Sequence, residues 1–308
     1  MSMTPGASFL PSWLPLLATA VVGPFLMLSS GFLFAVTDGL IKFMGPSCRV
    51  WDIAFYRFGC GMAILLLVFG WRHNPFAGDN PKLLIFRGIA GSIAFVAEVF
   101  AIRLIPISTA LVLFYTFPAF AALFSMLLMK EETTKELLWV LLALCGVAVF
   151  LDFRLEGGIS GQLISLLGAV FAGAAVTSVR KLRETNGPVI IYFYFCLTGA
   201  AITIVPFASN PQLPTSAQEW YFMAGIVGLS LIAQLLMNEG FLYCKSWEGG
   251  LLLTSEVLFV SLWGIIFLSE TVSWRFWTGG AMILVSIIAL NYGTARRLSL
   301  RGITPAKN

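Results

Sequence analysis

Long apolar runs constrain this chain more than any other feature of its sequence. Ten such runs, nearly free of charge, recur along its 308 residues. A run of about twenty apolar residues crosses the hydrocarbon core of a bilayer as a helix, because a helix satisfies its own backbone polar groups where water is absent. Only 11% of the residues are charged, against about 25% in soluble domains. The sequence therefore predicts an all-α integral membrane protein with ten transmembrane helices.

The predicted spans form two sets of five. The first set is Leu16–Ile41, Ile53–Gly70, Leu83–Ile102, Ile107–Met129 and Leu137–Leu151. The second set is Leu163–Val179, Val189–Phe207, Trp220–Tyr243, Gly249–Ser269 and Phe276–Tyr292. Residues 1–20 contain no Lys or Arg, whereas a cleaved signal peptide begins with basic residues. We therefore expect a retained first span and no processed form.

Basic residues are distributed unevenly between alternate loops. An N-terminus in the cytoplasm places this group inside: Arg72, Lys82, Arg87, Lys130, Lys135, Arg180, Lys181, Arg183, Lys245, Arg296, Arg297, Arg301 and Lys307. The outer group is then Lys42, Arg49, Arg103, Arg154 and Arg275. Cytoplasmic loops carry an excess of Lys and Arg. We therefore expect both termini in the cytoplasm, and we do not interpret the net charge of +4 as nucleic-acid binding.

The second half of the chain repeats features of the first. Three segments of the first half, 98–102, 107–111 and 128–131, have counterparts at 239–243, 247–251 and 268–270. Because five spans is an odd number, the second copy is inserted upside down, which is a recurrent architecture in secondary transporters. We predict two inverted repeats over 16–151 and 160–293. They are flanked by a cytoplasmic segment, 1–15, and a basic cytoplasmic tail, 294–308.

Short motifs along both halves resemble those of the EamA-like family of the drug/metabolite transporter superfamily. They are Phe55–Phe58, Pro106–Leu111, Pro118 and the acidic turns at Glu131 and Glu270. The resemblance implies a basket-like fold of ten helices. It also implies a central cavity lined by the first, third and fourth helices of each repeat, and alternating access.

The same resemblance implies what the chain transports. It indicates export or exchange of amino acids, related amines or similar metabolites, usually across a bacterial inner membrane. Some relatives take up compounds such as S-adenosylmethionine, so uptake of a nucleoside-type metabolite is the alternative. The expected partners are a small-molecule substrate, the lipid bilayer and, as a candidate, a coupling proton. We expect a monomer or a weak homo-oligomer.

A few polar side chains inside the spans are candidates for the substrate pathway, because charges in hydrocarbon are costly and usually face the bundle interior. They are Glu98, Tyr115, Gln234, Asn238, Glu239 and Glu256. Glu98 and Glu239 occupy equivalent positions in the two copies, and each would bind a cationic group or a coupling proton. The alternative is a buried carboxylate paired with Arg57 or with a backbone donor. For the two amides, Gln234 and Asn238, the alternative is hydrogen bonding between helices.

Other charges and prolines are candidates for gating or structure. Asp38 and Lys42 lie four residues apart and can form a local pair. Arg57 has a long side chain that can reach the outer interface and anchor its helix there. Three prolines are candidate hinges or packing kinks, namely Pro24, Pro106 and Pro118.

An enzyme is the remote alternative. The string Gly158–Gly161 resembles the surroundings of an intramembrane serine nucleophile, but the sole histidine, His73, is predicted on the opposite side of the membrane. The five cysteines are isolated from one another, and no phosphate-binding loop occurs. We therefore expect no catalytic residues, no metal and no cofactor. A channel is disfavoured because inverted repeats indicate alternating access.

Overall fold

The computed structural model describes residues 16–44, 48–70, 74–105, 107–129, 137–150, 158–259, 262 and 274–300. Every regular element in these ranges is helical. The first half contains α1 (Leu16–Met44), α2 (Val50–Val68), α3 (Pro81–Leu104), α4 (Ile107–Phe114), α5 (Phe117–Phe124), a π-helical turn at Ser125–Met129, and α6 (Leu137–Phe150). The second half contains α7 (Ile159–Leu182), α8 (Pro188–Ser209), α9 (Ala217–Gly240), α10 (Ser246–Leu253) and α12 (Trp274–Leu300), with a short helix at 255–259.

Seven of the described helical segments are long and apolar enough to cross a membrane. They are Val21–Ile41, Val50–Val68, Pro81–Ala101, Ala110–Met129, Ile159–Leu182, Pro188–Ser209 and Ala217–Gly240. Two shorter apolar helices cover Leu138–Val149 and Trp277–Ser286. These nine segments fall on nine of the predicted spans, and the remaining one, Gly249–Ser269, is only partly described. The prediction of a helical, multi-pass membrane protein is confirmed.

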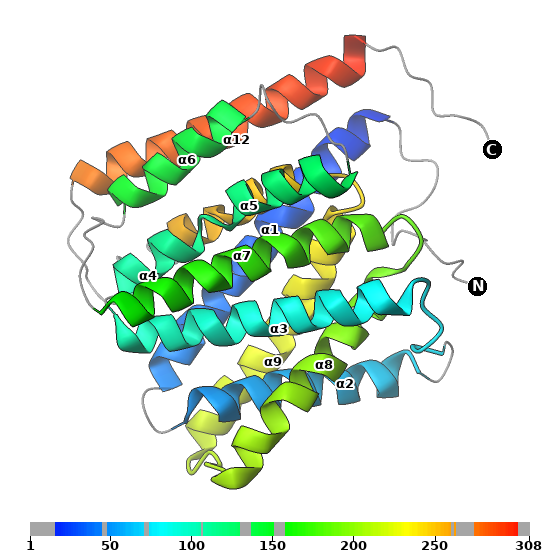
Figure 1. The fold of residues 1–308 in the computed structure, drawn as a ribbon, viewed down its shortest axis with the longest axis vertical. Helices are drawn as coiled ribbons and strands as arrows, with labels where there is room; N and C mark the ends of the chain where they lie inside the picture. The colour runs from blue at the N-terminus through cyan, green and yellow to red at the C-terminus, as the bar shows by residue number, and fades with distance from the viewer. Residues whose placement is uncertain are drawn as a thin grey trace.

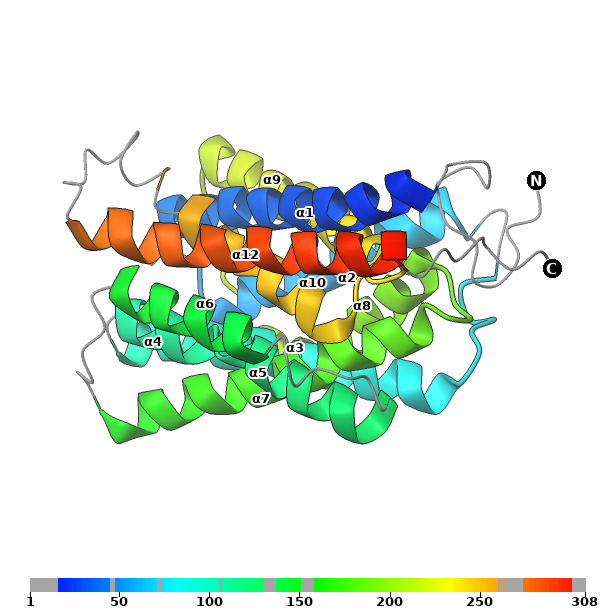
Figure 2. The same cartoon turned by 90° about the horizontal axis from the view of Figure 1, so that it is seen from above.

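The helices pack as a bundle in which the closest neighbours come from different halves of the chain. The pairs are α1 with α9, α3 with α7, α2 with α8, α5 with α7, and α6 with α12. Figures 1 and 2 both show α6 and α12 side by side, and in Figure 1 this pair lies at the opposite edge of the bundle from α2. The start of α1 and the end of α12 lie at the same end of the bundle (Figure 1).

Small residues allow these helices to approach closely. A Cβ atom on Gly173 of α7 would lie 2.7 Å from Cβ of Phe120 and 2.9 Å from the backbone N of Ala121, both in α5. In the same groove, the Ser165 hydroxyl donates a hydrogen bond to the Ala110 carbonyl at 2.6 Å. The α7 helix is therefore in backbone contact with α4 and α5, as is typical of membrane helix pairs.

The fourth predicted span, Ile107–Met129, is interrupted near Pro118, which the sequence singles out as a candidate hinge or kink. Helix α4 ends at Phe114 and α5 begins at Phe117. Two features explain the break. Pro118 has no N–H with which to continue the helical hydrogen bonds, and the Thr116 hydroxyl donates to the Leu113 carbonyl at 2.6 Å.

A second interruption lies in the predicted span Gly249–Ser269. Helix α10 ends at Leu253, and the chain becomes helical again over 255–259. The Thr254 hydroxyl donates to the Leu251 carbonyl at 2.7 Å, which is the same arrangement as at Thr116. Irregular backbone at membrane depth is tolerated only where it is buried in protein or lines a cavity. We therefore expect both interruptions to lie at the centre of the bundle.

The three predicted hinge prolines have different positions. Pro24 lies inside α1, which continues through it without interruption. Pro118 lies in the first turn of α5, next to the break. Pro106 lies outside the described residues. A hinge role for these prolines stays a prediction.

Candidate functional site

A cavity of about 140 Å³ lies in the centre of the bundle. Its lining side chains come from α1, α3, the α4–α5 break, α7, α9, α10 and the helix at 255–259. These are the first, third and fourth predicted spans of each half, which the family resemblance implied. Two further side chains also line it, Arg57 from α2 and Phe195 from α8.

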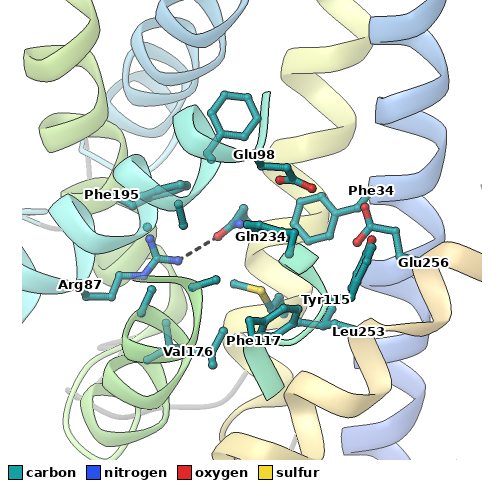
Figure 3. A pocket seen from close by; sticks show the side chains of 18 of the residues that line it. Phe34, Arg87, Glu98, Tyr115, Phe117, Val176, Phe195, Gln234, Leu253 and Glu256 are labelled. Atoms are coloured by element: carbon teal, nitrogen blue, oxygen red, sulfur yellow. Dashed lines mark hydrogen bonds between the residues drawn. The ribbon is translucent and has the colours of Figure 1, made fainter. Parts of the chain in front are cut away.

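One side of the cavity is acidic, and we call its four residues the acid wall: Asp38, Glu98, Tyr115 and Glu256. The Glu256 side chain is hydrogen-bonded to those of Asp38 and Tyr115. Two carboxyl groups can share a hydrogen bond only if one of them carries a proton. A hydrogen bond between Asp38 and Glu256 therefore requires a proton on one of the two groups. Figure 3 shows Glu98, Tyr115 and Glu256 on the side of the cavity away from Arg87.

Two arginines, Arg57 and Arg87, also line the cavity, and we call them the guanidinium pair. Arg87 is only 2% exposed, and its Nη2 donates to Gln234 Oε1 at 3.0 Å (Figure 3). Its guanidinium carbon lies 4.2 Å from the ring centroid of Phe195. Arg57 is 6% exposed and lies in the same way 4.3 Å from the ring of Phe95. Aromatic faces attract such cations, so both guanidinium groups are held in place by rings.

The positions of both arginines differ from those expected. Arg57 does not extend to the membrane interface but is buried and lines the cavity. Arg87, which the charge count placed among the inner loop residues, lies inside α3 and also lines the cavity. Arg87, Gly91 and Glu98 all lie on the cavity-facing side of α3. Their spacing, compatible with one helical face, is the signal that would have identified Arg87.

Of the predicted pathway residues in α9, only Gln234 lines the cavity. Asn238 is buried and its amide donates to the Pro188 carbonyl of α8 at 3.2 Å. Glu239 Oε2 lies 2.9 Å from Arg183 Nη2, and these side chains are 1% and 0% exposed. The carboxylate is therefore part of a buried ion pair, and its partner is Arg183 rather than Arg57.

This ion pair belongs to a network at one end of the bundle. Arg180 Nη1 donates to the carbonyls of Phe241 and Leu242, each at 3.2 Å. The Asn186 side chain accepts a hydrogen bond from the Asp79 amide at 2.8 Å and donates to the Asp79 carbonyl at 3.1 Å. These contacts tie the segment before α3, the α7–α8 turn and the end of α9 together.

The predicted pair of Asp38 with Lys42 is not described, because the Lys42 side chain lies outside the described part of the chain. Asp38 itself is exposed and forms its hydrogen bond with Glu256. Its position at the cavity makes it a member of the acid wall. A gating role for Asp38 stays a prediction.

A bundle of membrane-spanning helices around a central cavity with a few polar side chains is typical of small-molecule membrane transporters. The EamA-like transporter family matches residues 13–152 and 159–292, and the chain belongs to this family, within the drug/metabolite transporter superfamily. The resemblance inferred from the sequence motifs is confirmed. The protein is a multi-pass membrane transporter whose partners are a small-molecule substrate and membrane lipid.

Known relatives agree with this assignment. The chain is 26% identical over 271 residues to the pseudopaline exporter CntI of Pseudomonas aeruginosa, covering 87% of this chain and 95% of the relative. It is 23% identical over 294 residues to the human solute carrier family 35 member G1, covering 90% and 79% of the two chains. A solved crystal structure superposes with a TM-score of 0.74 at 19% identity, over 91% of this chain and 98% of the other. That similarity establishes the fold.

Proposed function

We propose that this chain is a secondary transporter that moves small amine-bearing metabolites, such as amino acids and related amines, by alternating access. The acid wall is the observation that carries the proposal. Three carboxyl groups, Asp38, Glu98 and Glu256, come from three separate helices to one central cavity. Carboxyl groups at membrane depth are costly and are usually functional. A cationic amine is the ligand group that such a surface favours.

We further propose an architecture of ten transmembrane helices in two inverted five-helix repeats, 16–151 and 160–293. The family matches two consecutive segments of the chain, 13–152 and 159–292, which supports the duplication. The helix pairs support it too, since α1 packs on α9 as α3 packs on α7, while α2–α8 and α6–α12 join equivalent helices. In such an architecture, two related halves that exchange conformations open the site to alternate sides of the membrane.

We propose that the protein lies in the inner membrane with both termini in the cytoplasm. The cytoplasmic parts then include the terminal segments 1–15 and 294–308. The bias of Lys and Arg between alternate loops supports it, and it persists after Arg87 is removed from the inner group. The network around Arg183 and Glu239 then lies at the cytoplasmic end. In this orientation the network holds the inner end of the bundle together.

Export or exchange is the direction that we propose. The match with the two Pseudomonas aeruginosa relatives covers 95% of their length, and both are exporters of pseudopaline. This similarity supports export. A proton shared by Asp38 and Glu256 is a candidate coupling ion, because a cationic substrate at the acid wall would displace it. A monomer or weak homo-oligomer is sufficient for this mechanism, since described residues of a single chain line the cavity.

Uptake of a nucleoside-type metabolite such as S-adenosylmethionine is the alternative. The cavity of about 140 Å³ resembles in size the roughly 150 Å³ cavity that holds a benzene molecule, and sites for drug-sized ligands measure about 300–1,000 Å³. A nucleoside would require the cavity to widen, whereas a small amino acid would not. The size of the cavity therefore favours amino acids and amines.

Counterflow into proteoliposomes tests the proposed function. Separate liposomes are preloaded with amino acids, amines or nucleosides, and the uptake of the corresponding labelled compound is recorded with and without a pH gradient. We expect saturable exchange of amino acids or amines and none of nucleosides. Exchange of nucleosides alone would favour the alternative. Folded, inserted protein that exchanges none of the three classes would contradict the proposal.

A further inference from the structure

The guanidinium pair lacks the partners that buried cations normally have. Nε and Nη1 of Arg87 and Nε of Arg57 are buried without a hydrogen-bond partner. The salt bridges found among the described residues join Arg49 to Asp52, Lys181 to Glu184 and Arg183 to Glu239. Neither arginine of the cavity takes part in them. A buried, unsatisfied donor is costly, and a charged one more so, so these groups call for an explanation.

The two arginines are not equally compensated. Arg57 lies within electrostatic reach of Asp38 and Glu98. Arg87 has the neutral oxygen of Gln234 as its hydrogen-bond acceptor, and Arg57 is close enough to repel it. Arg87 is therefore the cation of the cavity that most needs an anion.

We propose that Arg87, with Arg57 and Gln234, forms an anion subsite for the carboxylate of the transported metabolite, whose amine binds at the acid wall. This inference rests on the proposed transport function and deepens it. It narrows the substrate class from amino acids and related amines to metabolites that carry both an amine and a carboxylate. The planar guanidinium group suits this role, because its donors match a carboxylate in geometry as well as in charge.

The arrangement along α3 fits a small dipolar ligand. Arg87 and Glu98 are three helical turns apart, a rise of about 16 Å, and both side chains line the same cavity. Figure 3 shows Arg87 and Glu256 on opposite sides of the cavity with Gln234 between them.

Gly91 keeps the space beside Arg87 open. A Cβ atom at this position would lie 3.1 Å from Arg87 Nη1 and 2.9 Å from Cε2 of Phe195. A larger residue would therefore press on the donor that has no partner. The ring of Phe195 supports one face of the guanidinium group, so that its edge remains available to a ligand.

Matched pairs of ligands test the proposal. Leucine and isoamylamine, and phenylalanine and phenethylamine, differ only by the carboxylate. Each serves as a competitor of labelled exchange in proteoliposomes that contain the full chain. We expect the amino acid to compete better than its amine in the unaltered protein. In Arg87→Met we expect its apparent affinity to fall by about ten- to hundred-fold, as for a lost hydrogen bond to a charged group. The affinity for the amine stays within about threefold.

Two further variants keep the test decisive. Lys181→Met removes a positive charge from an exposed ion pair with Glu184 and leaves both competitors unchanged. Arg87→Lys keeps the charge but loses the planar donors, so it retains part of the preference for the amino acid. If Arg87→Met does not fold, Arg87→Lys replaces it in the test. A fall in the affinity for the amino acid, with an unchanged affinity for the amine, then supports the anion subsite.

The outcomes separate this inference from the proposed function. Equal competition by amines and amino acids, unchanged in Arg87→Met, would overturn the anion subsite and leave transport intact. Inhibition by chloride or inorganic phosphate alone, lost in Arg87→Met, would identify a site for a free anion and also overturn the proposal. If no compound of any class exchanges, the proposed function fails and the inference fails with it.

Discussion

The buried ion pair between Arg183 and Glu239 gives a prediction with a defined magnitude. The two side chains are 0% and 1% exposed and lie 2.9 Å apart. Removing one partner of such a pair leaves an uncompensated buried charge, which costs about 3–5 kcal/mol. Glu239→Leu and Arg183→Met should each lower the free energy of unfolding by about this amount.

The double variant Arg183→Met/Glu239→Leu should be far more stable than the sum of its single changes, because it leaves no buried charge. It still loses the hydrogen bond from Arg183 Nη1 to the Asn186 carbonyl, so we expect a net cost of about 1–2 kcal/mol. The coupling free energy is then several kcal/mol.

Reversible unfolding in mixed micelles measures this double-mutant cycle. The exposed pair Lys181–Glu184, with side chains 57% and 42% exposed, is the matched control. Its coupling should be about 0.2–1 kcal/mol. A coupling for Arg183–Glu239 no larger than the control would refute the reasoning. Transport by the double variant separates the two interpretations of Glu239, because a pathway residue cannot be replaced by Leu without loss of transport.

Three further predictions concern the packing of α7 and the break before α5. Gly173→Ala should destabilise the protein by about 1–3 kcal/mol in a thermal unfolding assay, because the added methyl group overpacks the contact with α5. In the same assay Gly228→Ala, with nothing within 4 Å of its new Cβ, should be neutral or stabilising. Equal effects of the two changes would contradict the close approach of α7 to α5. Ser165→Ala should cost about 0.6–1 kcal/mol, as for a hydrogen bond between membrane helices, and no change in midpoint would count against that bond. Thr116→Val removes the hydroxyl that bonds the Leu113 carbonyl and should lower the counterflow rate without a comparable loss of stability, while an unchanged rate would show that the break does not depend on it.

The helices could be predicted from the sequence because a bilayer leaves an apolar run few alternatives. Helix α3 illustrates this: its run is preceded by Asn80, whose side chain accepts a hydrogen bond from the Leu83 amide, and by Pro81 in the first turn. Pro118 indicated a kink near the first interruption, but the full break there and the second interruption could not be predicted. Thr116 and Thr254 lie inside apolar runs, and the composition of these runs does not show that their hydroxyl groups bond to the preceding turn.

Part of the candidate site could be predicted from the sequence. Glu98, Tyr115, Gln234 and Glu256, singled out as polar groups inside apolar runs, come together in one cavity, and their role in transport stays a prediction. Arg87 was missed because a basic residue near the start of a span looks like a loop charge in a count of Lys and Arg. The partner of Glu239 was missed because Arg183 lies in a different helical region, and no local spacing connects them.

The central claim is that the acid wall binds the transported molecule. The most direct test is the rate of counterflow for Glu98→Gln and Glu256→Gln, compared with Glu184→Gln, which makes the same change in an exposed carboxylate outside the cavity. The account predicts a loss of about tenfold or more in each cavity variant, as for a lost interaction with a charged group, and an unchanged rate in Glu184→Gln. Wild-type rates in both cavity variants, with the protein folded and inserted, would contradict it.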